Sequence, residues 1–299
     1  MKNILICTSS FDLANIKDIK FSNKIKIKLN PYRRKLKENE LISLLNKDTI
    51  GIISGTEKIT LKVLDVAKNL QVISRCGTGT DNIHHAVFKK KIKIFKTDKE
   101  PIMAVAEFVL TQILMVLKNS YSHNLFMHKK KWKKIKGGML SNKTFGIIGF
   151  GKIGKKIKKL LKPFNCKFLI YDPHIIKFKK IGQLNKLLKS SDIISLNIPF
   201  NSENKNFINF KKINMMKDNS IFINCSRGGL VDEKAILKII KKKPSIRFIL
   251  DCFDQEPYSG KFNKFDNIIM SPHVASFTKE TRDLMERNSF LNLIKNIKN

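Results

Sequence analysis

Short apolar runs alternate with helix-like segments from the first residues of the chain onward. Residues 3–7, 50–53 and 71–74 predict buried strands, and residues 37–45 and 60–68 have the apolar spacing of amphipathic helices. Strand and helix follow one another in turn, which is typical of parallel α/β architecture. The first hundred residues therefore predict a parallel sheet with covering helices.

The same alternation restarts near residue 144 with a stronger pattern. Strands are predicted at residues 144–148, 167–171, 193–196, 220–224, 247–251 and 268–270. Helices are predicted at residues 103–117, 152–161, 232–241 and 279–297. Six strands make the sheet of a complete dinucleotide-binding domain, so this part of the chain predicts a doubly wound fold.

The net charge changes this picture less than its size suggests. The formal charge is +35, from 59 lysines and arginines against 24 aspartates and glutamates. Such basicity is the usual footprint of nucleic-acid binding, but only seven of the basic residues are arginine, whose fork reads bases and phosphates. Because the lysines are spread along the whole chain, we expect no specific nucleic-acid partner.

The sequence contains neither a candidate membrane span nor the cysteine spacing of a disulfide framework. No apolar run approaches the roughly 18 residues that a membrane span needs, and the five cysteines include no C-x-x-C pair. We therefore expect a cytoplasmic protein with reduced thiols, no membrane partner and no bound metal.

A glycine motif lies between the first strand and the first helix of the second half. Gly149, Gly151 and Gly154 form the pattern G-x-G-x-x-G. The first permits a tight turn, the second lets a pyrophosphate approach the backbone, and the third allows close helix packing. The positive end of the helix then faces the phosphates. Glycines also mark ordinary loops, but the flanking strand and helix are the context that this motif requires.

Asp172 ends the next predicted strand, 18 residues after Gly154. A carboxylate at this distance accepts hydrogen bonds from the adenosine ribose and repels a 2′-phosphate. We therefore predict NAD rather than NADP as the cofactor. His174 and Lys177 nearby would weaken this discrimination, and the alternative is that Asp172 is only a turn residue.

Three further polar side chains follow the last three predicted strands. They are Arg227, Glu256 and His273. A guanidinium can grip an α-carboxylate and polarise the neighbouring carbonyl. An imidazole can move the hydroxyl proton, and a carboxylate beside it fixes its orientation and stabilises its charge. One such residue alone is more often structural, but the three together predict 2-hydroxyacid chemistry.

Seven stretches carry a more specific pattern from near one end of the chain to near the other. They are residues 30–33, 73–82, 105–107, 145–154, 224–233, 250–257 and 271–275. In them the chain resembles the D-isomer-specific 2-hydroxyacid dehydrogenases, and most of all their phosphoglycerate dehydrogenase branch. The resemblance implies reversible hydride transfer between NAD and a D-2-hydroxy acid.

The resemblance also assigns roles to single residues. The catalytic set falls on Arg227, Glu256 and His273. The Gly-rich turn that holds the substrate carboxylate on backbone amides falls on Arg75, Cys76, Gly77, Thr78 and Gly79. Cofactor contacts fall on Gly149, Gly151, Lys152, Ile153, Gly154, Asp172, Pro199, Cys225, Ser226 and Asp251, the last of these near the nicotinamide carboxamide.

The domain organisation follows from the same resemblance. It implies two Rossmann-like domains with doubly wound parallel sheets, of which the substrate domain is discontinuous. We place the substrate domain at residues 1–97 plus 276–299 and the NAD-binding domain at 98–275. Family members are usually homodimers paired through the cofactor domain, which puts much of the contact in residues 103–140.

The sequence does not distinguish between several 2-hydroxy acids as the substrate. Phosphoglycerate enzymes tend to carry an arginine in the loop after the second strand, where it meets the substrate phosphate, and residues 54–56 contain none. Either Arg33, Arg34 or Lys58 substitutes, or the substrate lacks a phosphate. The alternatives to a phosphoglycerate enzyme are a hydroxypyruvate or glyoxylate reductase and an NADH-sensing regulator. Formate oxidation is disfavoured, because such enzymes carry glutamine where this chain has Glu256.

Overall fold

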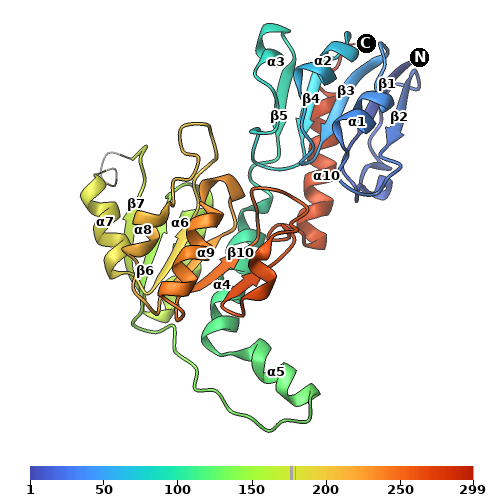
Figure 1. The fold of residues 1–299 in the computed structure, drawn as a ribbon. Coiled ribbons are helices and arrows are strands. Elements are labelled where there is room, and N and C mark those ends of the chain that lie inside the picture. Colours follow the sequence, from blue (N-terminus) through green and yellow to red (C-terminus); the bar gives the residue numbers. More distant parts are fainter. Residues whose placement is uncertain (176–177, 179, 299) are drawn as a thin grey trace. The chain divides into compact units, whose positions relative to one another are not determined.

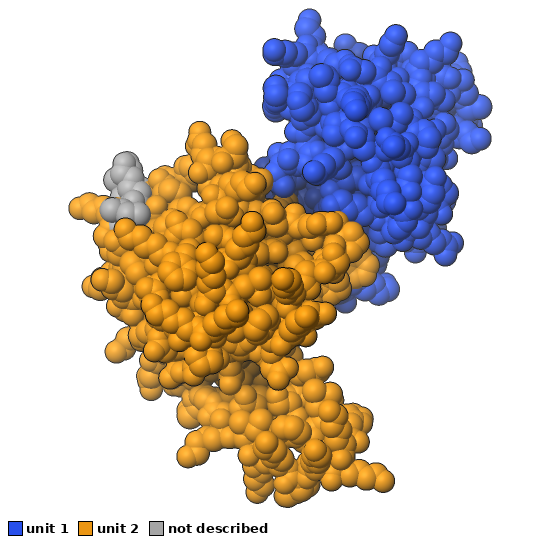
Figure 2. Space-filling model, viewed as in Figure 1, with its two compact units in different colours: residues 1–101, 278–299 blue, residues 102–277 orange. Residues whose placement is uncertain are grey.

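Two parallel β-sheets, one of five strands and one of six, form the centres of two units (Figure 1). The computed structural model describes residues 1–175, 178 and 180–298, so Lys177 lies outside the described residues. Unit 1 comprises residues 1–101 and 278–299, and unit 2 comprises residues 102–277 (Figure 2). The sequence places these boundaries a few residues earlier, at 97 and 275. The predicted class of two parallel α/β domains is confirmed.

The sheet of unit 1 has the strand order β2-β1-β3-β4-β5, with all neighbours parallel. Its strands are β1 (Lys2–Ile6), β2 (Ile25–Leu29), β3 (Thr49–Ser54), β4 (Val72–Arg75) and β5 (Lys93–Lys96). The three central strands are the predicted apolar runs. The two edge strands are not predicted because neither is a continuous apolar run. β2 alternates apolar residues with lysines, which is the pattern of a half-buried strand, and β5 has only two apolar residues between its lysines.

Helices cover both faces of this sheet. One face carries α1 (Glu38–Leu44), α2 (Leu61–Val66) and α3 (Ala86–Lys89), and the other carries α10 (Lys279–Ile294). Gly51 in β3 makes room for α10, because a Cβ at this position would lie 2.9 Å from a methyl group of Leu293. The C-terminal helix is therefore part of unit 1.

A buried carboxylate fixes α10 to the N-terminal part of the chain. Oε2 of Glu286 accepts hydrogen bonds from Asp12 N and Asn15 Nδ2, both at 2.9 Å. Oε1 accepts from Arg282 Nη2 at 2.6 Å. Glu286 is almost fully buried, and the Arg282 side chain is largely shielded as well.

Replacing Glu286 with alanine should lower the free energy of unfolding by about 3–5 kcal/mol, because the Arg282 guanidinium stays buried without this carboxylate. Urea unfolding followed by circular dichroism measures the loss. Asp65→Ala is the control, since Asp65 and Lys90 pair at exposed positions, and its cost should stay below about 1 kcal/mol. Equal losses for the two variants would contradict the assignment.

The sheet of unit 2 has the order β11-β10-β9-β8-β6-β7, again with all neighbours parallel. Its strands are β6 (Thr144–Ile148), β7 (Lys167–Tyr171), β8 (Ile193–Leu196), β9 (Ile221–Asn224), β10 (Arg247–Leu250) and β11 (Ile268–Met270). All six match predicted strands to within one residue. The strand order reverses between β6 and β8, and ligands of open α/β sheets bind at the carboxyl ends of strands beside such a reversal.

Two layers of helices cover this second sheet. One face packs on α4 (Pro101–Leu117) and α6 (Lys152–Leu161), and the other packs on α7 (Ile181–Ser190), α8 (Phe210–Asn214) and α9 (Glu233–Lys242). Helix α5 (Ser120–His128) has no buried residue. Among the described helices none alone is long and apolar enough to cross a membrane, and α4 with α5 meets that test only as a pair bent by 61°.

Candidate active site

The turn between β6 and α6 has the shape that its three glycines predict. Gly149 has a φ of +91°, and a Cβ there would lie 2.5 Å from Asn197 O. A Cβ on Gly151 would meet nothing within 4 Å, so the start of α6 is open at this point. A Cβ on Gly154 would lie 2.3 Å from Gly149 O. An open helix N-terminus suits a pyrophosphate group.

Asp172 lies directly after β7, and its carboxylate is bonded to the glycine turn. Oδ2 accepts from Phe150 N at 2.6 Å, and Oδ1 accepts from His174 N at 2.8 Å. Each carboxylate oxygen has a second acceptor site. The side chain therefore fixes the turn and can also accept from ribose hydroxyls.

The other expected cofactor residues lie along the same edge of the sheet. Lys152 and Ile153 are the first two residues of α6. Pro199 is exposed after β8, and the Ser226 hydroxyl donates to the last carbonyl of β8 at 2.7 Å. Burial raises the pKa of the Cys225 thiol well above its usual value, with the Asp251 charge adding to the effect, so the thiol stays neutral.

Arg227 lies on the loop after β9, and this loop packs against the loop after β10. Asn224, the last residue of β9, accepts from Ser226 N at 3.0 Å and donates to Arg227 O at 2.9 Å. A Cβ on Gly228 would lie 1.8 Å from the carbonyl carbon of Phe253, so the two backbones are in direct contact. Nη1 of Arg227 donates to Ser226 O at 2.8 Å, and this hydrogen bond holds one end of the guanidinium against the backbone of its own loop.

His273 and Glu256 form the pair that the sequence predicts. Nδ1 of His273 lies 3.0 and 3.1 Å from the two carboxylate oxygens of Glu256, and Oε1 of Glu256 also accepts from Phe253 N at 3.1 Å. The carboxylate selects the tautomer with hydrogen on Nδ1, which leaves Nε2 for a substrate. His273 has a φ of +57°, and such backbone strain in non-glycine residues clusters at active sites.

Asp251 holds the turn that carries His273. It is fully buried after β10, and its Oδ1 accepts from the Ser271 hydroxyl at 2.5 Å and from Val274 N at 2.9 Å. Its Oδ2 accepts from Ala275 N at 2.8 Å. These donors precede and follow His273 in the chain, so the Asp251 carboxylate, which the sequence predicts near the nicotinamide, fixes the turn that carries His273.

Arg75 is the centre of the turn after β4 in unit 1. Its side chain is buried, and its guanidinium is directed at backbone carbonyl groups. Nε donates to Gly79 O at 3.0 Å, and Nη1 donates to Cys76 O at 2.5 Å. Arg75 therefore holds the turn in shape from its buried side. The sequence instead predicts a direct contact between Arg75 and the substrate.

The amides of this turn differ in their availability. Cys76 N donates to the last carbonyl of β3 at 2.9 Å, and Gly77 N donates to Thr97 Oγ1 at 2.8 Å. Within the described part of the chain the amides of Thr78 and Gly79 make no hydrogen bond. These two amides are the donors that the turn can offer to a carboxylate.

Arg34 is the least suited of the three cations considered for a substrate phosphate. Its Nη1 and Nη2 bond to the Glu40 carboxylate at 2.9 and 2.6 Å. The hydrogen bond from Arg34 is the main cause that lowers the pKa of Glu40 to about 2. Arg33 and Lys58 are exposed.

The comparison with protein families shows to which family the chain belongs. The model of the family described as D-isomer specific 2-hydroxyacid dehydrogenase, NAD binding domain, matches residues 110–275, which is more than half of the chain. The chain belongs to the D-isomer specific 2-hydroxyacid dehydrogenase family. The matched residues lie within unit 2.

Relatives of this chain fall into several named activities. A D-3-phosphoglycerate dehydrogenase of Methanocaldococcus jannaschii is 33% identical over 257 residues, 82% of this chain and 49% of that protein. A hydroxypyruvate reductase of Thermotoga maritima is 31% identical over 257 residues, 83% of this chain and 84% of that protein. The chain thus spans about half the length of the first relative.

A solved structure agrees with the fold of this chain. The NAD⁺-bound 3-phosphoglycerate dehydrogenase of Entamoeba histolytica has a TM-score of 0.80 at 23% identity and covers 100% of this chain and 98% of that one. NAD is the cofactor of the family domain. The open start of α6 at Gly151 and the acceptor carboxylate of Asp172 fit it.

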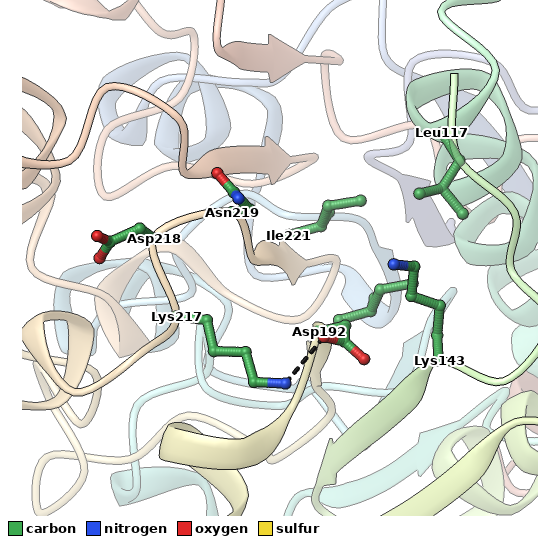
Figure 3. Close-up of a pocket in the computed structure, with 8 residues that line it drawn as sticks. Leu117, Lys143, Asp192, Lys217, Asp218, Asn219 and Ile221 are labelled. Atoms are coloured by element: carbon green, nitrogen blue, oxygen red, sulfur yellow. Dashed lines mark hydrogen bonds and ion pairs between the residues drawn. The ribbon is translucent and has the colours of Figure 1, made fainter. Parts of the chain in front are cut away.

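A separate cavity of about 470 Å³ lies at the opposite edge of the same sheet, where β6, β8 and β9 begin (Figure 3). Lys217 Nζ pairs with Asp192 Oδ1 at 2.9 Å, and Asp192 Oδ2 accepts from Thr144 N at 2.8 Å. These contacts join the starts of two strands. Because doubly wound dehydrogenases bind ligands at the carboxyl ends of their strands, this cavity is distinct from the candidate active site.

Two supporting residues escape the sequence analysis. Asn224 positions the loop of Arg227, and Ser271 helps Asp251 to hold the turn of His273. Both are polar residues at or just after the end of a strand, two or three residues before a catalytic candidate. That position is the signal that could have found them.

Proposed function

We propose that this chain catalyses reversible hydride transfer between NAD(H) and a D-2-hydroxy acid or its 2-keto acid. The hydrogen-bonded pair of His273 and Glu256 carries the proposal. It lies at the carboxyl edge of the sheet that also bears the glycine turn and Arg227. An acid–base residue, its orienting carboxylate, a guanidinium and a dinucleotide-binding turn are the parts that this reaction needs.

Each residue has a defined task in the reduction direction. Bound NADH supplies the hydride for the keto carbon. His273 donates a proton from Nε2 to the carbonyl oxygen while Glu256 holds the hydrogen on Nδ1. Arg227 binds the carboxylate and polarises the carbonyl. In the oxidation direction His273 takes the hydroxyl proton, and the same contacts operate in reverse.

Further roles are proposed for residues of each unit separately. We assign unit 1 as the substrate domain, with Thr78 and Gly79 amides on the carboxylate and Arg75 beneath them. We assign unit 2 as the NAD-binding domain. Its proposed cofactor contacts are Gly149, Gly151, Lys152, Ile153, Gly154, Asp172, Pro199, Cys225, Ser226 and Asp251.

The test is the loss of NADH absorbance with a panel of 2-keto acids, including hydroxypyruvate, glyoxylate and 3-phosphohydroxypyruvate. Turnover of at least one acid is the expected result. NADH binding without turnover of any acid would contradict the proposed activity and favour an NADH-sensing regulator instead.

Asp172→Asn should raise the ratio of kcat/KM for NADPH over NADH by about tenfold, because it removes the charge that repels a 2′-phosphate. Initial rates with the two cofactors measure the ratio. Asp266→Asn makes the same change of net charge at an exposed position in unit 2 and should leave the ratio unaltered. An unchanged ratio in the folded Asp172 variant would refute the cofactor assignment.

We also propose a homodimer that forms through the arm, defined as residues 118–139. In Figure 2 the arm forms part of the lobe of unit 2 that projects from the rest of that unit. Large apolar side chains are exposed on it at Tyr121, Met127, Trp132 and Met139, and Trp132 is 80% exposed. Four large apolar side chains exposed on one segment of 22 residues favour a protein contact.

Light scattering after gel filtration should give twice the chain mass of 34.5 kDa. Trp132→Glu should shift the population towards the monomer, because it places a charge in the proposed contact. Ser202→Glu adds the same charge at an exposed position of unit 2 outside the arm and should leave the dimer intact. A wild-type monomer, or a dimer unaffected by Trp132→Glu, would contradict this contact.

The cytoplasm is the proposed compartment of the enzyme. Its five cysteines are free, and three of them are buried. Free thiols of this kind persist in a reducing compartment.

A further inference from the structure

Glu233 lies at the junction between two loops of unit 2 that carry catalytic candidates. It is the first residue of α9, six residues after Arg227, so it ends the loop that follows β9. Asp232 caps the helix, and its Oδ1 accepts from Lys234 N at 3.0 Å and from Ala235 N at 3.1 Å. The capped helix end therefore holds the backbone of Glu233 in place.

The Glu233 side chain reaches the neighbouring loop, which follows β10. Its Oε1 accepts a hydrogen bond from Asp254 N at 2.9 Å. Asp254 follows Phe253, whose own N–H donates to Oε1 of Glu256 at 3.1 Å. Two consecutive amides of this loop are thus bonded, one to Glu233 and the other to Glu256. The hydrogen bond of Glu233 therefore acts on the segment that sets the position of the Glu256 carboxylate.

Stacked aromatic rings anchor the two ends of this segment. The ring of Phe253 stacks on that of Tyr258 with centroids 4.3 Å apart, and Tyr258 stacks on Phe262 at 5.3 Å. Phe253 and Phe262 are buried, whereas Asp254 between the anchors is exposed. Glu233 therefore supplies a polar contact to the exposed part of the segment, which the apolar packing does not cover.

The contact can form in either ionisation state of Glu233. Burial raises the pKa of the Glu233 carboxyl, the hydrogen bond from Asp254 N opposes this rise, and the Asp254 charge adds to it. A carboxylate and a carboxylic acid both have an oxygen that accepts a hydrogen bond. The contact therefore depends on an acceptor oxygen rather than on the negative charge.

Building on the proposed function, we propose that Glu233 is a positioning residue for the acid–base pair, because it fixes the loop of Glu256 to the start of α9. The Glu256 oxygens lie 3.0 and 3.1 Å from Nδ1 of His273, where they hold the hydrogen. A loop that moves at Asp254 shifts Phe253 N, and with it the carboxylate that this amide holds. Small displacements of a catalytic group lower the rate strongly.

Glu233→Ala removes the acceptor and should lower kcat for the best 2-keto acid of the panel by about tenfold or more. KM for the keto acid and Kd for NADH should stay within about twofold, since Asn224 holds the loop of Arg227 independently of Glu233. Steady-state kinetics and NADH fluorescence titration measure these constants, and circular dichroism verifies the fold.

Two further substitutions of Glu233 separate the hydrogen bond from charge and from packing. Glu233→Gln keeps an acceptor oxygen and removes the charge, so its kcat should stay within about twofold of the wild-type value. Glu233→Met fills nearly the same space without an oxygen and should lower kcat as Glu233→Ala does, even if the alanine variant folds poorly. Glu280→Ala removes an exposed acidic residue from the first turn of α10 and should leave kcat unchanged.

The outcomes separate this inference from the proposed function. A kcat within about twofold of wild type for both Glu233→Ala and Glu233→Met overturns the positioning role, as does a glutamine variant that loses as much activity as the alanine variant. A rise of KM and Kd that matches the fall in kcat overturns it too, because Glu233 would then act through the stability of unit 2. Absence of wild-type turnover with every 2-keto acid overturns the proposed function itself, and the positioning proposal falls with it.

Discussion

His273→Asn should lower kcat for reduction of a 2-keto acid by about 10²–10⁴-fold while leaving the Kd for NADH unchanged. The substitution removes the imidazole that delivers the proton and that is bonded to Glu256. Asparagine is the matched replacement, because it tolerates the φ of +57° better than most residues. Steady-state kinetics and NADH fluorescence titration measure the two quantities.

The control for this variant is His128→Asn. His128 is an exposed histidine on α5, far along the chain from the pair with Glu256, and its loss should leave kcat within about twofold. If His273→Asn turned over at a near-normal rate with a normal circular dichroism spectrum, the acid–base assignment would be wrong.

Arg227→Lys should raise KM for the keto acid by about 10–100-fold with a smaller effect on kcat. Lysine keeps the positive charge but loses one of the two hydrogen bonds of the guanidinium fork, and a hydrogen bond to a charged group contributes about 1.5–3 kcal/mol. Loss of a contact made equally in the ground and transition states appears mainly in KM. Initial rates over a range of keto-acid concentrations separate the two constants.

Arg247→Lys provides the comparison for that result. Arg247 lies at the start of β10, where Nη1 donates to Val116 O at 3.0 Å, so its replacement should leave KM unaltered. Equal rises in KM for the two variants would mean that Arg227 acts only through the stability of unit 2.

The central strands and the positions of the candidate site residues could be predicted from the sequence for a common physical reason. Strands buried on both faces read as apolar runs, and β6, β8 and β9 are of this kind. Parallel strands bring their carboxyl ends to one edge, so polar residues that follow such runs gather there. That is how the contact of His273 with Glu256 could be anticipated.

The parts that could not be predicted depend on long-range contacts. The edge strands β2 and β5 are short and contain few apolar residues, and each is fixed by pairing with one neighbouring strand. The inward direction of Arg75 and the clamp of Asp251 on the His273 turn depend on backbone groups brought together only by folding. A residue type and its place in a motif therefore predict where a side chain lies. They predict less well which groups that side chain will contact.

The same distinction applies to the buried glutamate of unit 1. Glu57 reads in the sequence as an ordinary polar residue in a loop, and its burial shows only when the loop after β3 closes on Cys7 and Arg75.

The central claim is tested most directly by the product formed from a 2-keto acid and NADH deuterated at the transferred position. The account predicts a 2-hydroxy acid of D configuration with one deuterium on the carbon that carries the hydroxyl. An L product, an unlabelled product, or no product from enzyme that binds NADH would contradict it.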